Sequence, residues 1–478
     1  MQIIDEQRII AALDANQNPS RQDCLALIEK ARSLKGLRVE EAAALLQTSD
    51  AGVLRELFAA AREVKEAIYG TRLVLFAPLY LTNFCVNNCL YCGFRRDNRE
   101  LFRSALAIDE IGREVEALLG EGHKRLLLVA GEDPRTSNIS YLEMAIEAVY
   151  AARQGKSSIR RVNINVAPMP LEHFRRLKAT KIGTYQLFQE TYHYETYQKM
   201  HPDGPKSDYA ARLAAMDNAQ QAGIDDVGIG ALFGLYDYRF EVLALLMHAE
   251  YLEGKYGTGP HTISVPRLES ASGAPLSENP PYPVSDEDFK KLVAIIRLSV
   301  PYTGMILSTR ETAELRNETF RLGISQISAG SLTSPGAYAK RGKEQEQSLS
   351  KGSKVELDEN KRPSSQFSVH DKRSTAEVVR DVCSMGFVPS FCTACYRSGR
   401  TGDYFMQFAK TGKIQNFCLP NALLTFKEYL VDYADGEMRA LGDKAIEREI
   451  VKVKDDKIRA KTRQRLQEIE KGARDLFF

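Results

Sequence analysis

The chain has 478 residues, 27% of them charged, with a formal net charge of only +2. This length exceeds one ordinary domain, and the near-neutral charge argues against nucleic acid as a partner because it provides no extended positive field. The first residues lack a secretory signal and no apolar run reaches the roughly 18 residues of a membrane span, so we expect a cytoplasmic protein that does not enter a membrane.

The first 70 residues are predicted to be helical. Between residues 20 and 70 apolar side chains recur at intervals of three and four, and Gly70 is a plausible stop. We therefore assign residues 1–70 to a helical N-terminal segment.

Beyond residue 70 the pattern changes to short apolar runs separated by amphipathic helices. The runs occupy residues 72–81, 125–132, 162–168, 185–191, 227–234, 262–268, 305–311 and 324–330. Strands that alternate with helices predict a parallel sheet, and the span of roughly 260 residues matches the ~250 of an eight-fold β/α barrel. We predict an α/β fold with a TIM-type barrel over residues 71–338; a doubly wound sheet is the rival.

The remaining residues divide into a polar and a helical part. Residues 339–365 are nearly devoid of apolar side chains, which predicts a surface loop or linker over residues 339–375. Residues 376–478 read as a small, mainly helical C-terminal domain.

Three cysteines follow the first predicted strand. Cys85, Cys89 and Cys92 form a C-x3-C-x2-C pattern. An iron-sulfur cluster usually takes four cysteines, so three thiolates predict a 4Fe-4S cluster with one open iron. Buried core cysteines on a helix and a zinc site are the alternatives. The spacing, with Tyr91 before the last cysteine, resembles the signature of the radical S-adenosylmethionine (SAM) enzymes.

That resemblance implies which residues bind SAM at the predicted strand ends. Gly131, Glu132 and Asp133 end the second run as the family's glycine-and-acid motif does, facing the SAM amino group. Glu190 is placed to reach the ribose hydroxyls, and the fork geometry of Arg212 suits the carboxylate. The alternative for each residue is an ordinary surface carboxylate or ion pair.

A second cysteine group lies in the C-terminal domain. Cys392, Cys395 and Cys418 again provide three thiolates, which predicts an auxiliary iron-sulfur cluster. Zinc is the rival, because Cys383 lies nine residues upstream of Cys392 and would complete a four-thiolate site.

The two cysteine groups with a barrel between them resemble the family of tyrosine lyases that mature the active site of FeFe hydrogenase. The resemblance implies that L-tyrosine is cleaved to p-cresol and dehydroglycine, and that dehydroglycine yields carbon monoxide and cyanide at the auxiliary cluster. It also implies a fifth iron, free cysteine as its bridge, a low-potential electron donor, and other hydrogenase maturation proteins as partners.

The same resemblance assigns three further residues. His261 is implied as a ligand of the extra iron, whereas Arg310 and Ser308 are implied to hold the substrate carboxylate. Structural roles for these residues are the alternatives. At the level of the whole chain, the rivals are a thiazole-pathway tyrosine lyase (2-iminoacetate synthase) with a zinc-bound tail and a non-catalytic iron-sulfur scaffold.

Overall fold

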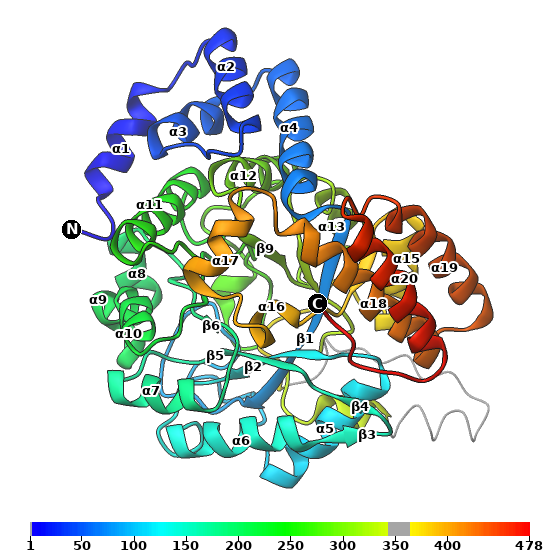
Figure 1. Ribbon diagram of the computed structural model, residues 1–478. Coiled ribbons are helices and arrows are strands. Elements are labelled where there is room, and N and C mark those ends of the chain that lie inside the picture. Colours follow the sequence, from blue (N-terminus) through cyan, green and yellow to red (C-terminus); the bar gives the residue numbers. More distant parts are fainter. Residues whose placement is uncertain (1, 343–363) are drawn as a thin grey trace.

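The computed structural model describes residues 2–342 and 364–478, and eight parallel strands form its centre. These strands are β1 (Arg72–Thr82), β2 (Arg125–Ala130), β5 (Arg161–Asn165), β6 (Tyr185–Gln186), β7 (Val227–Gly230), β8 (Thr262–Ser264), β9 (Gly304–Leu307) and β10 (Gln326–Ser328). Because β10 pairs with β1 in parallel, the sheet closes into a barrel (Figure 1). The predicted barrel is confirmed and the doubly wound rival is wrong.

Each apolar run of the sequence overlaps one strand, and β1 shows why. All but one of its residues are buried, without the alternation of a half-exposed strand. A parallel strand covered on both faces needs this composition. The other strands end earlier than their runs, since the residues that follow turn into the loops at the carboxyl end of the barrel.

Helices cover the outside of the barrel (Figure 1). They are α5 (Ile108–Gly120), α6 (Ile139–Ala151), α7 (Leu171–Ala179), α8 (Tyr194–Met200), α9 (Tyr209–Leu213), α10 (Ala215–Gln221), α11 (Tyr238–Tyr256), α12 (Asp286–Ser299) and α13 (Ala313–Thr319). A hairpin of β3 (Arg153–Gln154) and β4 (Ser157–Ser158) precedes β5.

The N-terminal segment is helical, as predicted. It contains α1 (Glu6–Ala15), α2 (Arg21–Arg32), α3 (Val39–Gln47) and α4 (Ala51–Tyr69). Side chains of Asp5, Ser20 and Asp50 cap three of these helices, and α4 ends at Gly70, whose φ of 63° suits glycine. The helices pack on α11 and α12 of the barrel.

The C-terminal part is mainly helical, with one strand that the sequence did not predict. It comprises α15 (Thr375–Ser384), β11 (Val388–Ser390), α16 (Ala394–Arg397), α17 (Gly402–Ala409), α18 (Gln415–Tyr433), α19 (Gly436–Ile450) and α20 (Asp456–Glu470). Strand β11 pairs in parallel with the first residues of β1, and Val74 pairs with both β10 and β11. The C-terminal part therefore joins the amino end of the barrel.

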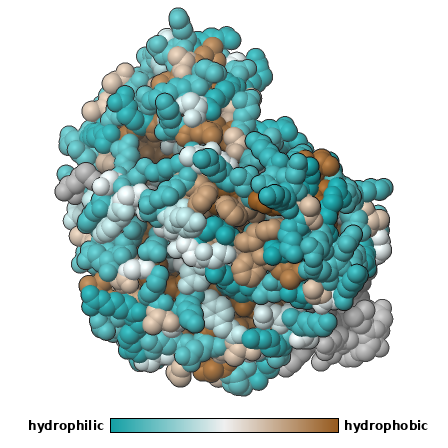
Figure 2. Space-filling model, viewed as in Figure 1, coloured by the Kyte–Doolittle hydropathy of each residue, from teal (hydrophilic) through white to brown (hydrophobic). Residues whose placement is uncertain are grey.

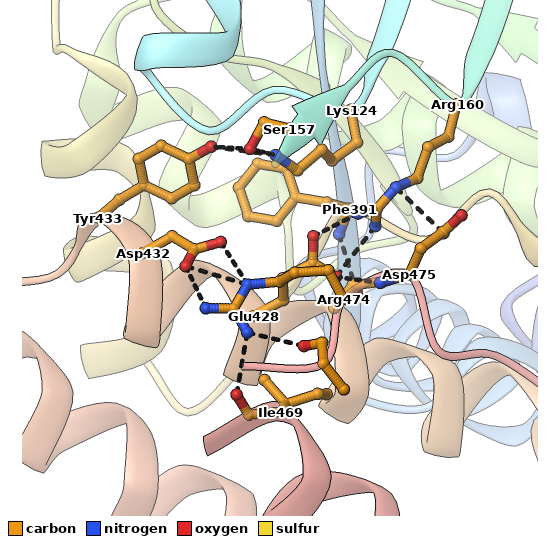
Figure 3. A network of polar contacts seen from close by, with 12 residues as sticks. Lys124, Ser157, Arg160, Phe391, Glu428, Asp432, Tyr433, Ile469, Arg474 and Asp475 are labelled. Carbon is orange, nitrogen blue, oxygen red and sulfur yellow. Dashed lines mark hydrogen bonds and ion pairs between the residues drawn. The ribbon is translucent and has the colours of Figure 1, made fainter. Parts of the chain in front are cut away.

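Buried polar contacts fasten α18 and the C-terminal tail to that end (Figure 3). Arg160, just before β5, pairs with Glu428 of α18 and with Asp475 of the tail, and the Arg160 and Glu428 side chains are almost fully buried. Nearby, Lys124 donates to Ser157 at 2.8 Å and to the Tyr433 hydroxyl at 3.0 Å. These contacts fix the second cysteine group against the barrel.

The surface is mainly hydrophilic on the face drawn in Figure 2, with apolar side chains gathered chiefly near the C-terminus and α18. Among the described residues no helix combines the length and the apolar composition needed to cross a membrane.

Candidate functional site

The first cysteine group lines a cavity at the carboxyl end of the barrel, called here the upper cavity. The loop after β1 brings Cys85, Cys89 and Cys92 to one wall of this cavity. Other predicted residues that line it are Tyr91, Gly131, Glu132, Glu190, Arg212, Ser308 and Arg310. Chemistry in β/α barrels is located at this end, because loops from several strands converge there.

The cysteine loop is held against the end of β2. The Val86 amide donates to the Glu132 carbonyl at 2.7 Å, and Asn87 Nδ2 donates to the Glu132 carboxylate at 2.6 Å. A Cβ at Gly131 would lie 2.3 Å from the Phe84 carbonyl oxygen, so only glycine permits this approach. The glycine and the acid of the motif thus place the cysteines.

The side chain of Asp133 is directed into the loop after β2 and not into the upper cavity. Its buried carboxylate accepts hydrogen bonds from the Arg135 side chain and from the backbone amides of Arg135 and Thr136. These contacts shape the loop after β2, and among the described residues that line the upper cavity Asp133 is absent. Its part in cofactor binding stays a prediction.

Glu190 of the upper cavity combines an unusual backbone conformation with contacts to two cations. It has a left-handed backbone with φ of 74°, unusual for a residue other than glycine. Lys206 donates to its carboxylate at 2.7 Å, and Arg212 lies 3.4 Å away. Burial would raise the pKa of Glu190, but the two cations outweigh it and lower the pKa. Sequence reasoning missed Lys206, which lies in a three-residue 3-10 helix (Pro205–Ser207) too short to show a periodicity.

The aromatic residue of the motif is fixed by a histidine. The Tyr91 hydroxyl is 2.8 Å from His201 Nε2, and His201 Nδ1 is 2.8 Å from the Tyr197 carbonyl oxygen. Burial lowers the pKa of His201, so a neutral imidazole orients Tyr91.

Ser308 and Arg310 follow β9 on the opposite wall. The Arg310 amide is 3.4 Å from Ser308 Oγ, and one guanidinium nitrogen is 3.5 Å from the Arg267 carbonyl oxygen. The guanidinium stacks on the Phe367 ring, 3.3 Å from its centroid. A half-buried cation in a partly apolar cavity fits a carboxylate ligand.

The second cysteine group lines another cavity at the amino end of the barrel, called here the lower cavity. Cys392 precedes α16, Cys395 lies on α16, and Cys418 lies on α18. His261, just before β8, shares the cavity with all three, and its ring lies 4.7 Å from that of Phe405. Burial lowers the pKa of His261 to about 4, so the imidazole is neutral and able to bind metal.

Arginines surround the lower cavity, and the sequence analysis missed them. Arg72, Arg125 and Arg161 open β1, β2 and β5, and all three are buried. Within the described residues, Arg72 Nε and Arg125 Nε and Nη2 lack a hydrogen-bond partner, whereas Arg161 binds Asn163 and Thr184. The signal was visible: an arginine precedes the apolar residues of three strands that neighbour one another in the barrel.

Positive charge also acts on the lower cysteines. A hydrogen bond from Cys418 lowers the pKa of Cys395, and the charges of Arg400 and Arg72 lower it further. The pKa of Cys418 rises, because the two sulfurs share one proton and Cys418 is the donor. At the upper cavity, by contrast, burial raises the pKa of Cys89 to about 12. A bound metal deprotonates such a thiol.

Cys383 lies apart from the other C-terminal cysteines. Its thiol is on α15 and approaches the Leu441 carbonyl oxygen at 4.0 Å, and it is absent from the described lining of the lower cavity. The geometry therefore gives no support to the zinc site with Cys383 as fourth ligand.

Both donor sets fit a cluster. No three His, Cys, Asp or Glu side chains within the described part of the chain are grouped for a single metal ion. A cubane spaces its cysteines more widely than one ion does, because each thiolate binds a different iron. Three thiols beside paired acids and cations suit a cluster that binds the zwitterionic amino-acid end of SAM, and three thiols with an imidazole and arginines suit an anionic cluster.

The two cavities follow one another along the barrel interior. On β1, Arg72 and Val74 line the lower cavity, and Phe76, Pro78 and Tyr80 line the upper. On β10, Gln326 lines the lower cavity and Ser328 the upper. Alternate residues of a strand share a face and lie about 7 Å apart, so the cavities adjoin inside the barrel.

Comparison with known proteins places the chain among relatives that cover most or all of its length. The Radical SAM superfamily model matches residues 79–246, and the Biotin and Thiamin Synthesis associated domain matches residues 264–388. The chain is 32% identical to 2-iminoacetate synthase of Escherichia coli (strain K12), over 76% of this chain and 89% of that protein.

Two solved structures extend over the C-terminal cysteines. A crystal structure of HydG, a maturase of the [FeFe]-hydrogenase, is 51% identical, with a TM-score of 0.93 and coverage of 100% of both chains. The FeFe-hydrogenase maturase HydG from Carboxydothermus hydrogenoformans is 42% identical, with a TM-score of 0.81 and coverage of 96% of this chain and 97% of that chain.

Proposed function

The chain belongs to the HydG family of radical SAM maturases of FeFe hydrogenase, and from this membership we propose that it cleaves L-tyrosine and builds an iron–carbonyl–cyanide unit. The observation that carries the proposal is the pair of adjoining cavities in one barrel, each lined by three cysteines.

The upper cavity performs the cleavage. Cys85, Cys89 and Cys92 hold a 4Fe-4S cluster, and Glu132, Glu190 and Arg212 bind SAM with Tyr91. When bound, cluster and SAM would supply a 5′-deoxyadenosyl radical that takes a hydrogen from the tyrosine amino group. Cleavage of the Cα–Cβ bond would then give dehydroglycine and a hydroxybenzyl radical, which becomes p-cresol by taking up one electron from the low-potential donor and one proton. The protein positions the reactants and excludes water from them.

Ser308 and Arg310 hold the substrate. The guanidinium binds the tyrosine carboxylate, because it faces the upper cavity and its contacts within the described chain are one long hydrogen bond and the Phe367 ring. Such a clamp orients the amino group, so its loss affects the rate of productive cleavage as well as tyrosine affinity.

The lower cavity performs the second step. Dehydroglycine carries a carboxylate, and Arg72 and Arg125 present buried N–H groups that find no hydrogen-bond partner in the described parts of the chain. These groups draw the anion from the upper to the lower cavity, where carbon monoxide and cyanide form. Cys392, Cys395 and Cys418 would hold an auxiliary 4Fe-4S cluster, and His261 would bind a fifth iron together with free cysteine.

Partners follow from this chemistry. A low-potential electron donor reduces the first cluster, and other hydrogenase maturation proteins receive the product in the cytoplasm.

The test is turnover by the anaerobically reconstituted protein with SAM, dithionite and tyrosine. We expect deoxyadenosine, p-cresol, carbon monoxide and cyanide, and about eight or nine irons per chain. Absence of both deoxyadenosine and p-cresol would reject an enzyme in favour of a scaffold. About four irons with zinc, and p-cresol without carbon monoxide, would identify a 2-iminoacetate synthase instead.

A further inference from the structure

Residues 364–371, called here the rim segment, close one side of the upper cavity. The sequence places them in a polar linker, yet backbone hydrogen bonds tie them to the barrel rim on several sides. The Gln366 amide donates to the Thr333 carbonyl at 3.0 Å, and the Asp371 amide to Thr309 at 3.1 Å. The segment is thus a fixed part of the barrel mouth.

The rim segment also touches the cysteine loop. The Gly93 amide donates to the Gln366 carbonyl at 3.1 Å. A Cβ at Gly93 would lie 2.7 Å from the Ser365 carbonyl oxygen, so the glycine after Cys92 is required for this approach. The contact is therefore specified by both segments.

Gln366 reaches the cysteine loop with its side chain as well. Tyr80 donates its hydroxyl to Gln366 Oε1 at 2.8 Å, which fixes the amide so that Nε2 points at Cys92 Sγ, 3.8 Å away. Hydrogen bonds to cluster sulfurs set reduction potential, because they stabilise the more negative, reduced state.

Phe367 lies against the opposite wall. Its ring faces the Arg310 guanidinium at 3.3 Å, and its carbonyl accepts from Thr333 Oγ1 at 3.1 Å. The side chains of Phe367 and Arg310 both line the upper cavity. The ring therefore fixes the plane of the guanidinium that faces the substrate.

We propose that the rim segment is a wall of the radical site, in which Gln366 positions Cys92 and its cluster and Phe367 positions Arg310. This inference rests on the proposed function and adds two positioning residues to it. The segment couples the two reacting parts, because its adjacent residues Gln366 and Phe367 touch the cluster loop and the substrate clamp.

The test for Gln366 is a redox titration of the first cluster, monitored by EPR without tyrosine. Gln366→Leu and the isosteric Gln366→Glu both lack the N–H donor, so we expect a lower midpoint potential in each, with the tyrosine KM unchanged. Ser368→Ala is the matched control, since its hydroxyl contacts Ser270 at the exposed rim at 2.9 Å. Potentials equal to that of Ser368→Ala would overturn the role of Gln366.

The test for Phe367 separates KM from kcat. Phe367→Leu removes the aromatic face and is expected to raise the tyrosine KM about 3- to 30-fold, as the loss of a cation–π contact allows, without moving the cluster potential. Phe367→Tyr should restore the KM. An unchanged KM in Phe367→Leu would overturn the role of Phe367. If the unaltered protein makes no p-cresol, the proposed function fails, while the potential shift still reports on the rim segment.

Discussion

The two ends of the barrel use cysteine in different settings. At the upper cavity all three cysteines come from one loop, and acids and cations face each other, as in Glu190 with Lys206 and Arg212. At the lower cavity the cysteines belong to the C-terminal domain, and buried arginines of the barrel outnumber nearby acids such as Asp226. Paired acids and cations suit the zwitterionic amino-acid end of SAM, whereas an excess of buried cations suits anions. The ends therefore differ in the charge they are built to receive.

The largest effect is expected from removing the cysteines of one end at a time. Cys392→Ser with Cys395→Ser should leave p-cresol formation near its normal rate and abolish carbon monoxide. Cys89→Ser should abolish deoxyadenosine and every later product, because the radical requires the upper cluster. Both variants are assayed for p-cresol by chromatography and for carbon monoxide by binding to haem protein.

Circular dichroism of the two cysteine variants provides the control for folding. Equal loss of p-cresol and carbon monoxide in the Cys392 and Cys395 double variant would show that the two ends do not divide the reaction.

A second way to separate the ends is to loosen the lower one. Arg160 and Glu428 form a buried ion pair between the barrel and α18, and removing one partner leaves the other charge uncompensated. Arg160→Leu should therefore cost about 3–5 kcal/mol of unfolding free energy. Carbon monoxide yield should fall more than p-cresol yield, since the pair supports the lower cavity only.

Arg463→Leu is the matched control, because its pair with Glu447 is exposed, with side-chain exposures of 47% and 62%. Such pairs contribute at most about 1 kcal/mol. Equal midpoints in chemical unfolding of the two variants would contradict the importance of the buried contact.

The eight strands and both cysteine groups were readable from the sequence, because periodicity and close spacing are local signals. Strand β11 could not be read from the sequence, because its three residues, Val388–Ser390, form a strand only by pairing with β1. The roles of Gln366 and Phe367 could not be predicted, because the segment has the composition of a linker and the contacts of both residues depend on a rim formed by distant residues. Arg72, Arg125 and Arg161 repeat at the starts of three predicted strands, but the sequence does not show that these starts face one cavity.

A third prediction concerns pH and the upper end. Glu241 of α11 accepts from the Thr191 hydroxyl and, at 2.9 Å, from the Tyr192 amide, directly after Glu190. Burial raises the pKa of Glu241 from 4.5 to about 8. The folded protein then keeps a proton that the unfolded chain releases, so stability should fall as pH rises from about 4.5 to about 8.

The expected loss is on the order of 4–5 kcal/mol across that window, since each pH unit contributes about 1.4 kcal/mol. Glu241→Gln cannot ionise and should flatten the dependence, as measured by urea unfolding at several pH values. An unchanged slope in the glutamine variant would assign the dependence to other groups.

The smallest expected effect tests the arginines of the lower end. Arg125 is buried, and its Nε and Nη2 have no hydrogen-bond partner among residues 2–342 and 364–478. Burial, together with the nearby charge of Arg161, lowers the pKa of Arg125. Arg297 is buried too, but it donates to the carbonyls of Gly323, Pro301 and Thr303. Arg297→Leu should therefore destabilise the fold, because it leaves those carbonyls unsatisfied. Arg125→Leu should keep or raise the melting temperature, because it removes an uncompensated buried charge.

If Arg125 guides dehydroglycine, its loss lowers carbon monoxide and cyanide yields about 10- to 100-fold, which corresponds to the free energy of one charged hydrogen bond, while p-cresol yield is unchanged. A lowered melting temperature with intact carbon monoxide yield would make Arg125 a structural residue like Arg297 and remove the charge contrast between the two ends.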